Sequence, residues 1–440
     1  MPYDILIGRD PEDKKKFGER GKILIGKGFV KMGNYSSLSN PIYLDVARTH
    51  VVLVAGKRGS GKSYTLGSIA EQLSDLPREE AKNIAPLIFD TMGIFWTMKY
   101  KNEKEKDLLS EWNLKSKNLP VRVFVPFGHF KSYLEKGIPA DEQFSISPGE
   151  LDAEDWIITF NLEMTSEAAV LIQKIVSHLK EESNEFHILD IISRINSEKQ
   201  TSQSIKNIAS GLFEAASTWG IFSDKNSKGN KMGRITDLVK SEITTILDLS
   251  VYNAVGAFNI RGLVIGIVIR KLFAERMSAR KKEETEAVNM GVNYLASKGK
   301  REFPLIWMFI DEVHEFLPET HKTPATDALI QLLREGRQPG ISLVMATQQP
   351  GALHRDAITQ SDIVISHRVT SEVDLKALNN MMQSYLLSSI NQYMDDLPRV
   401  KGSAIILDDN SERIYSMRVK PRFTWHGGEA PTAIAAERKI

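Results

Sequence analysis

The chain has 440 residues, of which 42% are hydrophobic and 26% charged, values typical of a globular protein that can bury a sizeable core. It contains no cysteine, which excludes disulfide frameworks, thiolate zinc sites and cysteine nucleophiles. The formal net charge is +1, so any contact with nucleic acid must come from basic residues concentrated on one face or around a pore.

The sequence gives no indication of a targeting or membrane segment. The amino terminus lacks the continuous apolar region of a secretory signal. The most apolar long stretch, residues 251–273, is interrupted by Arg261 and Arg270, whereas a membrane helix needs about 20 mostly apolar residues. We therefore expect a buried helix in this stretch, no contact with a membrane and a cytoplasmic location.

The first hundred residues carry the beginning of a sheet. Residues 1–40 are polar and turn-rich, and we expect a short amino-terminal segment with one or two strands. Val51–Ala55 is a continuous apolar run, typical of a strand buried on both faces of a parallel sheet. A glycine-rich turn, a helical pattern and a second buried strand at residues 86–90 follow it. Residues 41–100 are therefore predicted to form the first part of the core.

Residues 101–235 are predicted to be a largely helical insertion with one strand-like run at residues 121–125. Ser147 and Glu150 have the spacing of a capping box and indicate the start of a helix. Further on, apolar residues recur on one helical face: Ile205, Ile208, Leu212, Phe213 and Ala216. A polar loop rich in lysine, residues 224–233, ends the insertion.

Residues 236–440 are predicted to form the remainder of the core and a carboxy-terminal tail. A helix is expected over residues 261–276, and a charged exposed helix or loop over residues 276–300. The predicted strands are residues 243–249, Leu305–Ile310, and residues 341–346, 363–366 and 404–407. Strands that alternate with helices imply an α/β fold with a mostly parallel sheet covered on both faces.

Residues 56–63, GKRGSGKS, fit the pattern G-x-x-x-x-G-K-[ST] between a predicted strand and a predicted helix. Glycines let successive backbone amides point at phosphate oxygens, and the amino terminus of the helix faces the same anion. In this pattern Lys62 contacts the β- and γ-phosphates and Ser63 is a ligand of Mg²⁺. The residues expected to bind ATP are Gly56, Lys57, Arg58, Gly59, Ser60, Gly61, Lys62, Ser63 and Tyr64. A chance match is the alternative, which the flanking strand and helix disfavour.

Asp311 and Glu312 directly follow the apolar run Leu305–Ile310. Such a strand delivers its acids to the carboxyl edge of the sheet, where ligands bind in open α/β folds. We predict that Asp311 holds the hydration shell of Mg²⁺ and that Glu312 is the general base for the attacking water. Two adjacent acids at the end of a strand can also be a solvated turn, an alternative that the upstream P-loop disfavours.

Further candidate catalytic residues follow the next strands. Gln348 ends the run at residues 341–346, where an amide can sense the γ-phosphate or orient water. Arg334, Arg337 and Arg368 are candidates for an arginine finger, which neutralises transition-state charge and often comes from a neighbouring subunit. Arg368 is the first choice and Arg337 the second. Each of these residues can also be an ordinary loop or surface residue.

The sequence leaves open the roles of two residues near the predicted site. Asp90 ends the second buried strand and is either catalytic support or a plain turn residue. His314 lies close to the acids, but a lone histidine is more often structural or solvated.

The order of motifs resembles that of the HerA branch of the HerA/FtsK ATPases. The similarity covers residues 40–430, and its most specific part is REGRQPGISLVMATQQP together with the acids before it. The other motifs are the P-loop, FDTMGIFW, ILDLS, FIDEVHEFLP, SDIVISHRVTS and RFTWHGGEAP.

The resemblance implies a RecA-like core that assembles into a homohexameric ring and translocates along double-stranded DNA as a helicase. Many family members work with a NurA-type nuclease in the repair of DNA ends, and bacterial relatives act with other effectors in anti-phage defence. By motif match, the family's nucleotide roles fall on Lys62, Ser63, Asp311, Glu312 and Gln348.

Two departures from the family pattern stand out. Typical members carry an amino-terminal β-barrel that docks the nuclease, whereas the residues before this P-loop are expected to be too few for a full barrel. Many members also place an acidic residue soon after the aspartate of the second strand, where this chain has TMGIFW at residues 91–96.

Two functions are therefore weighed. The first is a DNA-translocating ring motor that grips phosphates through basic side chains and loop amides around a pore. Residues 224–233 are a candidate pore loop or, alternatively, an ordinary surface loop. The second is a nucleotide-gated scaffold ATPase that assembles and regulates a partner effector without substantial translocation. ATPase activity stimulated by duplex DNA favours the motor, and activity changed only by a partner protein favours the scaffold.

Overall fold

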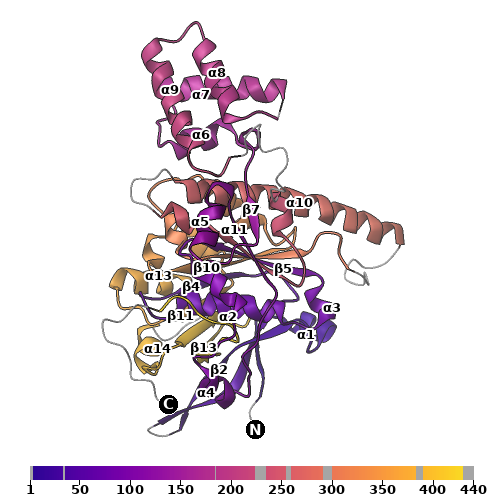
Figure 1. Cartoon of the computed structure of the whole chain (residues 1–440). Coiled ribbons are helices and arrows are strands. Elements are labelled where there is room, and N and C mark those ends of the chain that lie inside the picture. Colours follow the sequence, from indigo (N-terminus) through magenta and orange to yellow (C-terminus); the bar gives the residue numbers. More distant parts are fainter. Residues whose placement is uncertain are drawn as a thin grey trace.

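The computed structural model describes residues 3–32, 35–183, 185–222, 234–253, 259–290, 300–382 and 390–429. In these residues one 13-stranded sheet carries helices on its faces, and a group of helices stands off from it (Figure 1). The strand order is β1-β3-β2-β13-β12-β11-β4-β10-β9-β5-β8-β6-β7. The predicted pore loop, residues 224–233, lies outside the described residues.

The strands are β1 (Ile5–Ile7), β2 (Lys22–Met32), β3 (Tyr35–Asp45), β4 (Val51–Ala55), β5 (Ile84–Asp90), β6 (Val121–Pro126), β7 (Glu142–Phe144), β8 (Thr244–Asp248), β9 (Leu305–Ile310), β10 (Ile341–Thr347), β11 (Ile363–His367), β12 (Ser403–Asp408) and β13 (Arg413–Val419). The α-helices are α1 (Pro11–Phe17), α2 (Lys62–Ser74), α3 (Arg78–Ala81), α4 (Lys106–Glu111), α5 (Phe130–Glu135), α6 (Ala153–Thr159), α7 (Glu167–Glu182), α8 (Ile188–Ser197), α9 (Gln203–Ser217), α10 (Ile260–Met290), α11 (Thr326–Glu335), α12 (Arg355–Thr359), α13 (Glu372–Met382) and α14 (Ile390–Asp396).

The strands from β11 to β7 in the sheet order all pair in parallel. Their continuous apolar character follows from burial on both faces, because successive side chains point to opposite sides of a sheet. In β4, Val52 and Val54 belong to the core on one side, and Leu53 and Ala55 to the core on the other. The predicted α/β fold with a mostly parallel sheet is confirmed, and the predicted core strands shift by two residues at most.

The amino-terminal segment forms one edge of this sheet. β2 and β3 are an antiparallel hairpin, β2 also pairs with β13, and β1 lies parallel to β3. The prediction of one or two strands in residues 1–40 is too low, since three strands and α1 begin there. The sequence does not predict β13 either, because that strand is only partly buried and lacks an apolar run.

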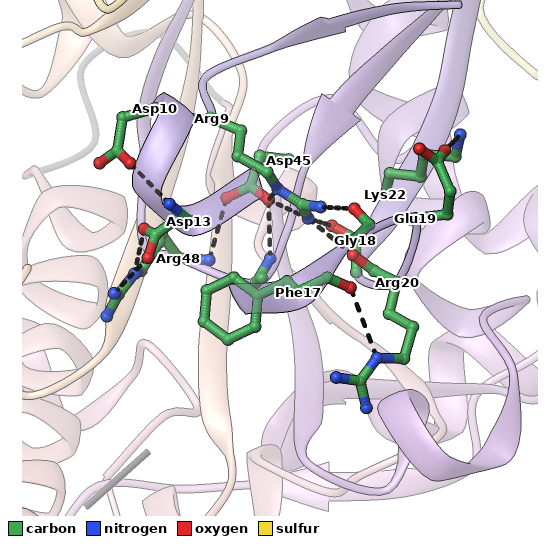
Figure 2. Close-up of polar contacts among 12 residues, drawn as sticks. Arg9, Asp10, Asp13, Phe17, Gly18, Glu19, Arg20, Lys22, Asp45 and Arg48 are labelled. Carbon is green, nitrogen blue, oxygen red and sulfur yellow. Dashed lines mark hydrogen bonds and ion pairs between the residues drawn. The ribbon is translucent and has the colours of Figure 1, made fainter. Parts of the chain in front are cut away.

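Charged side chains fasten this segment to the turn after β3 (Figure 2). Arg9 binds the Asp45 carboxylate and also donates to the Gly18 carbonyl at 2.8 Å. Arg48 makes two hydrogen bonds to Asp13, at 2.6 and 2.7 Å. Two arginine–carboxylate pairs therefore tie the amino-terminal segment to the residues that lead into β4.

Helices α6 to α9 form a lobe that stands off from the sheet (Figure 1). Trp156 is central to its packing, with its ring centroid 5.0 Å from that of Phe213 and 5.6 Å from that of Phe160. The predicted insertion, residues 101–235, is broader than this lobe, because β6 and β7 belong to the sheet.

Two local predictions for the lobe are wrong. The capping box of Ser147 and Glu150 starts only a short 3-10 turn, whereas α6 begins at Ala153 with Asp152 as its cap. Ile208, predicted to lie on the apolar face of α9, is 53% exposed. The buried face of that helix is rotated to Lys206, Ala209, Ser210, Phe213 and Ala216.

The predicted buried helix at residues 261–276 is the first half of α10, which continues to Met290 and extends past the sheet (Figure 1). The buried guanidinium of Arg276 donates to the carbonyls of Pro339 at 2.7 Å and Phe303 at 2.8 Å, and so attaches the middle of this helix to two other segments. Within the described residues, no helix combines the length and apolar character that crossing a membrane requires.

Candidate active site

The glycine-rich loop connects the end of β4 to the start of α2, as predicted. Gly61 precedes α2 with φ 112°, a conformation that side chains with a Cβ rarely adopt. At Gly56 a Cβ would lie 2.5 Å from Ser60 Oγ and 2.7 Å from His367 Cβ. No side chain caps the amino terminus of α2, so its first amides remain available to an anion.

Lys62 and Ser63, the first residues of α2, reach different parts of the site. The buried Lys62 ammonium lies 3.5 Å from the Lys57 carbonyl, so it folds back over the loop. Ser63 Oγ donates a hydrogen bond of 2.5 Å to Asp311 Oδ2. The structure therefore brings together the two motifs that the sequence places 248 residues apart.

Asp311 is almost completely buried at the end of β9. Burial raises its pKa, and the hydrogen bond from Ser63 and the charge of Lys62 oppose that rise. The second carboxylate oxygen accepts the backbone N–H of Glu312 at 2.9 Å. One oxygen is thus fixed by the backbone, and the other faces the P-loop serine.

Glu312 is held in a left-handed backbone conformation, φ 51° and ψ 46°, which is uncommon for a residue with a side chain. Burial, followed by the neighbouring charge of Asp311, raises its pKa to about 7. Its Oε2 atom has no hydrogen-bond partner within the described residues. Unusual backbone geometry and a carboxyl group that titrates near neutrality are typical of functional sites.

Gln348 follows β10, the strand between β4 and β9 in the sheet. Its backbone amide lies near the Glu312 carboxylate, where it opposes the rise in the pKa of that group. The preceding residue, Thr347, accepts the Gly56 N–H through its carbonyl at 3.2 Å. Gln348 thus lies beside both the glutamate and the P-loop.

Two histidines belong to this environment: His314, whose role the sequence left open, and His367, which the sequence patterns do not single out. His367 ends β11 beside the P-loop, where its Nε2 lies 2.8 Å from Thr65 Oγ1 and its Nδ1 3.0 Å from the Ser403 carbonyl. Burial lowers the pKa of His367 to about 4, so it is a neutral support beneath the loop. His314 Nδ1 lies 3.5 Å from Glu312 Oε2, and burial lowers its pKa as well.

The three arginine candidates occupy different places. The carbonyl of Arg368 accepts the Lys57 N–H at 3.3 Å, while its guanidinium donates to the Leu397 carbonyl at 2.7 Å. Arg334 is paired with Asp356 at 2.7 Å. Arg337 is exposed and precedes the amino end of β10, the edge of the sheet opposite the P-loop.

Asp90 is a turn residue in this structure. One of its carboxylate oxygens accepts the backbone N–H groups of Met92, Gly93 and Ile94, at 2.7 to 3.2 Å, and the other accepts that of Phe95 at 2.7 Å. Burial and the nearby charge of Asp248 raise its pKa to about 7. Hydrogen bonds from four backbone amides to this carboxylate thus fix the turn after β5.

Tyr64 links the P-loop helix to the carboxy-terminal segment. Its hydroxyl donates to Glu105 at 2.7 Å and accepts the Arg422 N–H at 2.7 Å. Lys57 and Arg58, by contrast, are exposed at the tip of the loop.

A glycine-rich loop between a parallel strand and a helix, with its serine bound to an acid on the next strand but one, defines a P-loop ATPase, an enzyme that hydrolyses ATP. Residues 30–257 match the family model described as the central domain of helicase HerA. The chain belongs to this family.

Two curated relatives carry the description "DNA double-strand break repair helicase HerA". The protein of Pyrococcus furiosus is 27% identical over 173 residues, which cover 36% of this chain and 29% of that protein. The protein of Saccharolobus solfataricus is 22% identical over 405 residues, covering 90% of this chain and 67% of the relative. The chain thus spans less than a third of the Pyrococcus relative.

One solved structure shares the fold of this chain. VirB4 of Thermoanaerobacter pseudethanolicus superimposes with a TM-score of 0.55 at 10% sequence identity, over 92% of this chain and 97% of that one. The likeness extends over most of both chains and agrees with the predicted RecA-like α/β core.

Proposed function

We propose that this protein is a ring-forming, ATP-driven DNA translocase or helicase of the HerA type. The main structural evidence for the ATPase site is the hydrogen bond between Ser63 and Asp311. The DNA substrate is supported by membership of the HerA helicase family and by the printed descriptions of the two relatives.

The phosphates of ATP would be held by backbone amides of residues 56–61 and by the amino terminus of α2. Lys62 would neutralise charge on the β- and γ-phosphates, since its ammonium already lies over the loop. The exposed Lys57 and Arg58 would add positive charge at the tip of the loop. The hydroxyl of Tyr64 is already bound twice, so we assign that residue to positioning at the nucleotide.

Magnesium fits the donor atoms that meet at Ser63 and Asp311. A hydroxyl and a carboxylate are the oxygen donors that Mg²⁺ takes from a protein when it keeps most of its water shell. Ser63 would be the direct ligand, and Asp311 would hold the bound water. When bound, Mg²⁺ would neutralise charge on the transferred phosphoryl group.

Glu312 would take the proton of the attacking water. A carboxyl group whose pKa is raised to about 7 suits a base that works near neutral pH. Its unpartnered Oε2 is the atom available for that water. The side chain of Gln348 would orient the same water, since its backbone already contacts the glutamate.

Assembly into a homohexamer would place an arginine of one subunit at the nucleotide of the next. Arg337 suits this role better than Arg368. It is exposed at the edge opposite its own P-loop, whereas the guanidinium of Arg368 is bound to Leu397 in the same chain. Double-stranded DNA would pass through the ring and be held by its phosphates. A nuclease or other effector would act with this motor in DNA end processing or defence.

The decisive measurement is ATP turnover by the full chain with and without duplex DNA, at low and at raised salt, with Glu312→Gln as the inactive control. Stimulation by DNA that weakens with salt supports the motor, because phosphate contacts release counterions. Turnover that ignores DNA but responds to a partner protein would support the scaffold ATPase instead. Electron microscopy with duplex DNA and an ATP analogue tests the ring, and monomers that do not bind DNA would contradict it.

A further inference from the structure

His314 lies between two strand ends of the active site. It belongs to the short 3-10 turn Val313–Glu315, which directly follows Glu312. Its Nδ1 atom is 3.3 Å from Thr347 Oγ1 and 3.5 Å from Glu312 Oε2. The side chain of His314 is 15% exposed and that of Glu312 is 17% exposed, so water surrounds neither of them fully.

Thr347 connects His314 to the rest of the site. Its hydroxyl oxygen accepts the Gln349 N–H at 3.0 Å, and its carbonyl accepts the Gly56 N–H at 3.2 Å. A single residue at the end of β10 thus contacts the P-loop, the segment that carries Gln348, and His314.

The imidazole can attract both oxygens at once. An ionised carboxylate only accepts hydrogen bonds, and a threonine hydroxyl can accept as well as donate. With its single N–H on Nδ1, a neutral imidazole donates a hydrogen bond to Thr347 Oγ1, while Glu312 Oε2 lies 3.5 Å away, close enough for electrostatic attraction but not hydrogen-bonded. Glu312 also needs such support, because its left-handed backbone conformation persists only where the surroundings hold it.

We propose that His314 is a positioning residue of the ATPase. Together with Thr347, it holds the Glu312 carboxylate toward the attacking water and couples that carboxylate to the Gln348 segment. This inference rests on the assignment of Glu312 as the base, made above. It predicts that loss of the imidazole slows the chemical step without weakening nucleotide binding.

The test compares kcat, KM and the affinity for an ATP analogue in matched variants of the full chain. His314→Leu and Thr347→Val are expected to lower kcat roughly 10- to 100-fold, the range for a misplaced catalytic group, with KM and analogue affinity unchanged. His314→Asn keeps a polar group near the position of Nδ1, and Thr347→Ser keeps the hydroxyl, so both should recover most of kcat. His314→Gln moves the polar group to the position of Nε2 and should recover little. His321→Leu removes an exposed histidine and serves as the control.

The double variant His314→Leu/Thr347→Val should be no slower than the slower single variant, because the two residues act as one unit. Additive losses would overturn the coupling. Equal activity of His314→Asn and His314→Leu would overturn the positioning role, and so would a loss of analogue affinity. If His314→Leu fails to fold, as thermal unfolding would reveal, Thr347→Val and Thr347→Ser decide the matter. Full turnover by Glu312→Gln would instead refute the base assignment, whereas an inactive Glu312→Gln beside an unimpaired His314→Leu would refute only the present inference.

Discussion

Ser63 at the start of α2 donates a hydrogen bond of 2.5 Å to Asp311 at the end of β9. The contact arises because β4, β10 and β9 are parallel neighbours, so their carboxyl ends meet at one edge of the sheet. Both side chains present an oxygen atom that can bind a metal ion. Ser63 is held in place by its helix, and Asp311 by the hydrogen bond from the Glu312 amide. The site is therefore largely preformed before any ligand enters.

Ser63→Ala and Asp311→Asn should each raise the Mg²⁺ concentration needed for half-maximal ATP turnover, roughly 10- to 100-fold, because each removes an oxygen donor or its charge. Titration of ATPase activity with Mg²⁺ measures the effect. Ser68→Ala is the matched control, since Ser68 is also buried on α2 and its hydroxyl has no hydrogen-bond partner within the described residues. Unchanged Mg²⁺ dependence in the first two variants would contradict the proposed metal site.

The carboxy-terminal segment should stabilise the P-loop helix through Glu71. This buried carboxylate accepts from Lys420 Nζ at 2.5 Å, from the Phe423 N–H at 2.9 Å, and from the N–H and hydroxyl of Thr424 at 3.1 and 2.9 Å. Glu71→Leu leaves the Phe423 and Thr424 donors without this acceptor and the buried Lys420 charge with only the Pro421 carbonyl, so we expect a loss of about 3–5 kcal/mol in the free energy of unfolding. Lys420→Met should cost less, because the other donors continue to satisfy the carboxylate.

Urea-induced unfolding of the two variants and the native chain measures the order of these losses. Glu79→Leu, at an exposed position of α3, is the control and should change stability little. If Lys420→Met were the more damaging change, the carboxylate would depend on the ion pair and not on the set of donors.

The parts of the site were predictable from sequence where each lies within one local pattern. The P-loop needs a strand, a turn and a helix in succession, and Asp311 and Glu312 need only the end of an apolar strand. His367 could not be found in this way, because its place beneath the P-loop depends on β11 lying beside β4. Strand order is a property of the whole sheet, and no short stretch of sequence states it.

The same limit applies where the sequence left alternatives open. For residues 276–300 it allowed an exposed helix or a loop, and α10 runs through this stretch as far as Met290, with Arg276 bound to the carbonyls of Pro339 and Phe303. Likewise, Asp90 caps its turn with four amides, whereas the sequence alone left a catalytic role equally open.

Stability should fall as the pH rises through neutrality because of His50. Burial alone would lower the pKa of this histidine, but the charges of Asp362 and Asp45 outweigh burial and raise it to about 9, above its ordinary value of 6.5. Nδ1 lies 2.6 Å from Asp362 and Nε2 3.1 Å from Asp45, the carboxylate that also binds Arg9. Asp408 is a further acid whose pKa His50 affects.

Since the folded pKa exceeds the unfolded one, the stabilisation is complete below pH 6.5, falls between pH 6.5 and 9, and is lost above that. It amounts to about 3 kcal/mol at most. The change of the free energy of unfolding with pH is measured by urea unfolding at about pH 6, 7.5 and 9, near the two ends and the middle of that window. His50→Gln should flatten the slope, whereas His321→Gln, at an exposed histidine, should preserve it. An undiminished slope in His50→Gln would assign the pH dependence to other groups.

Arg337 should act on the nucleotide of a neighbouring subunit. β10 spans seven residues, or ~20 Å at the usual rise per residue, and it separates Arg337 from the P-loop of the same chain. Arg337→Ala is therefore expected to bind ATP normally but to lower kcat roughly 10³-fold, as the loss of an arginine finger does. Arg334→Ala, one turn away and paired with Asp356, is the matched control and should remain active.

Mixing subunits separates action within a chain from action between chains. Lys62→Ala subunits cannot use ATP but keep Arg337, and Arg337→Ala subunits keep an intact P-loop. In mixed rings, some interfaces join the intact P-loop of an Arg337→Ala subunit to the intact Arg337 of a Lys62→Ala subunit. Turnover by the mixture should therefore rise above the sum of the two separate preparations. If the mixture shows only that sum while Arg337→Ala alone is inactive, the arginine acts within its own chain or on folding. In that case the ring model loses its main geometric support.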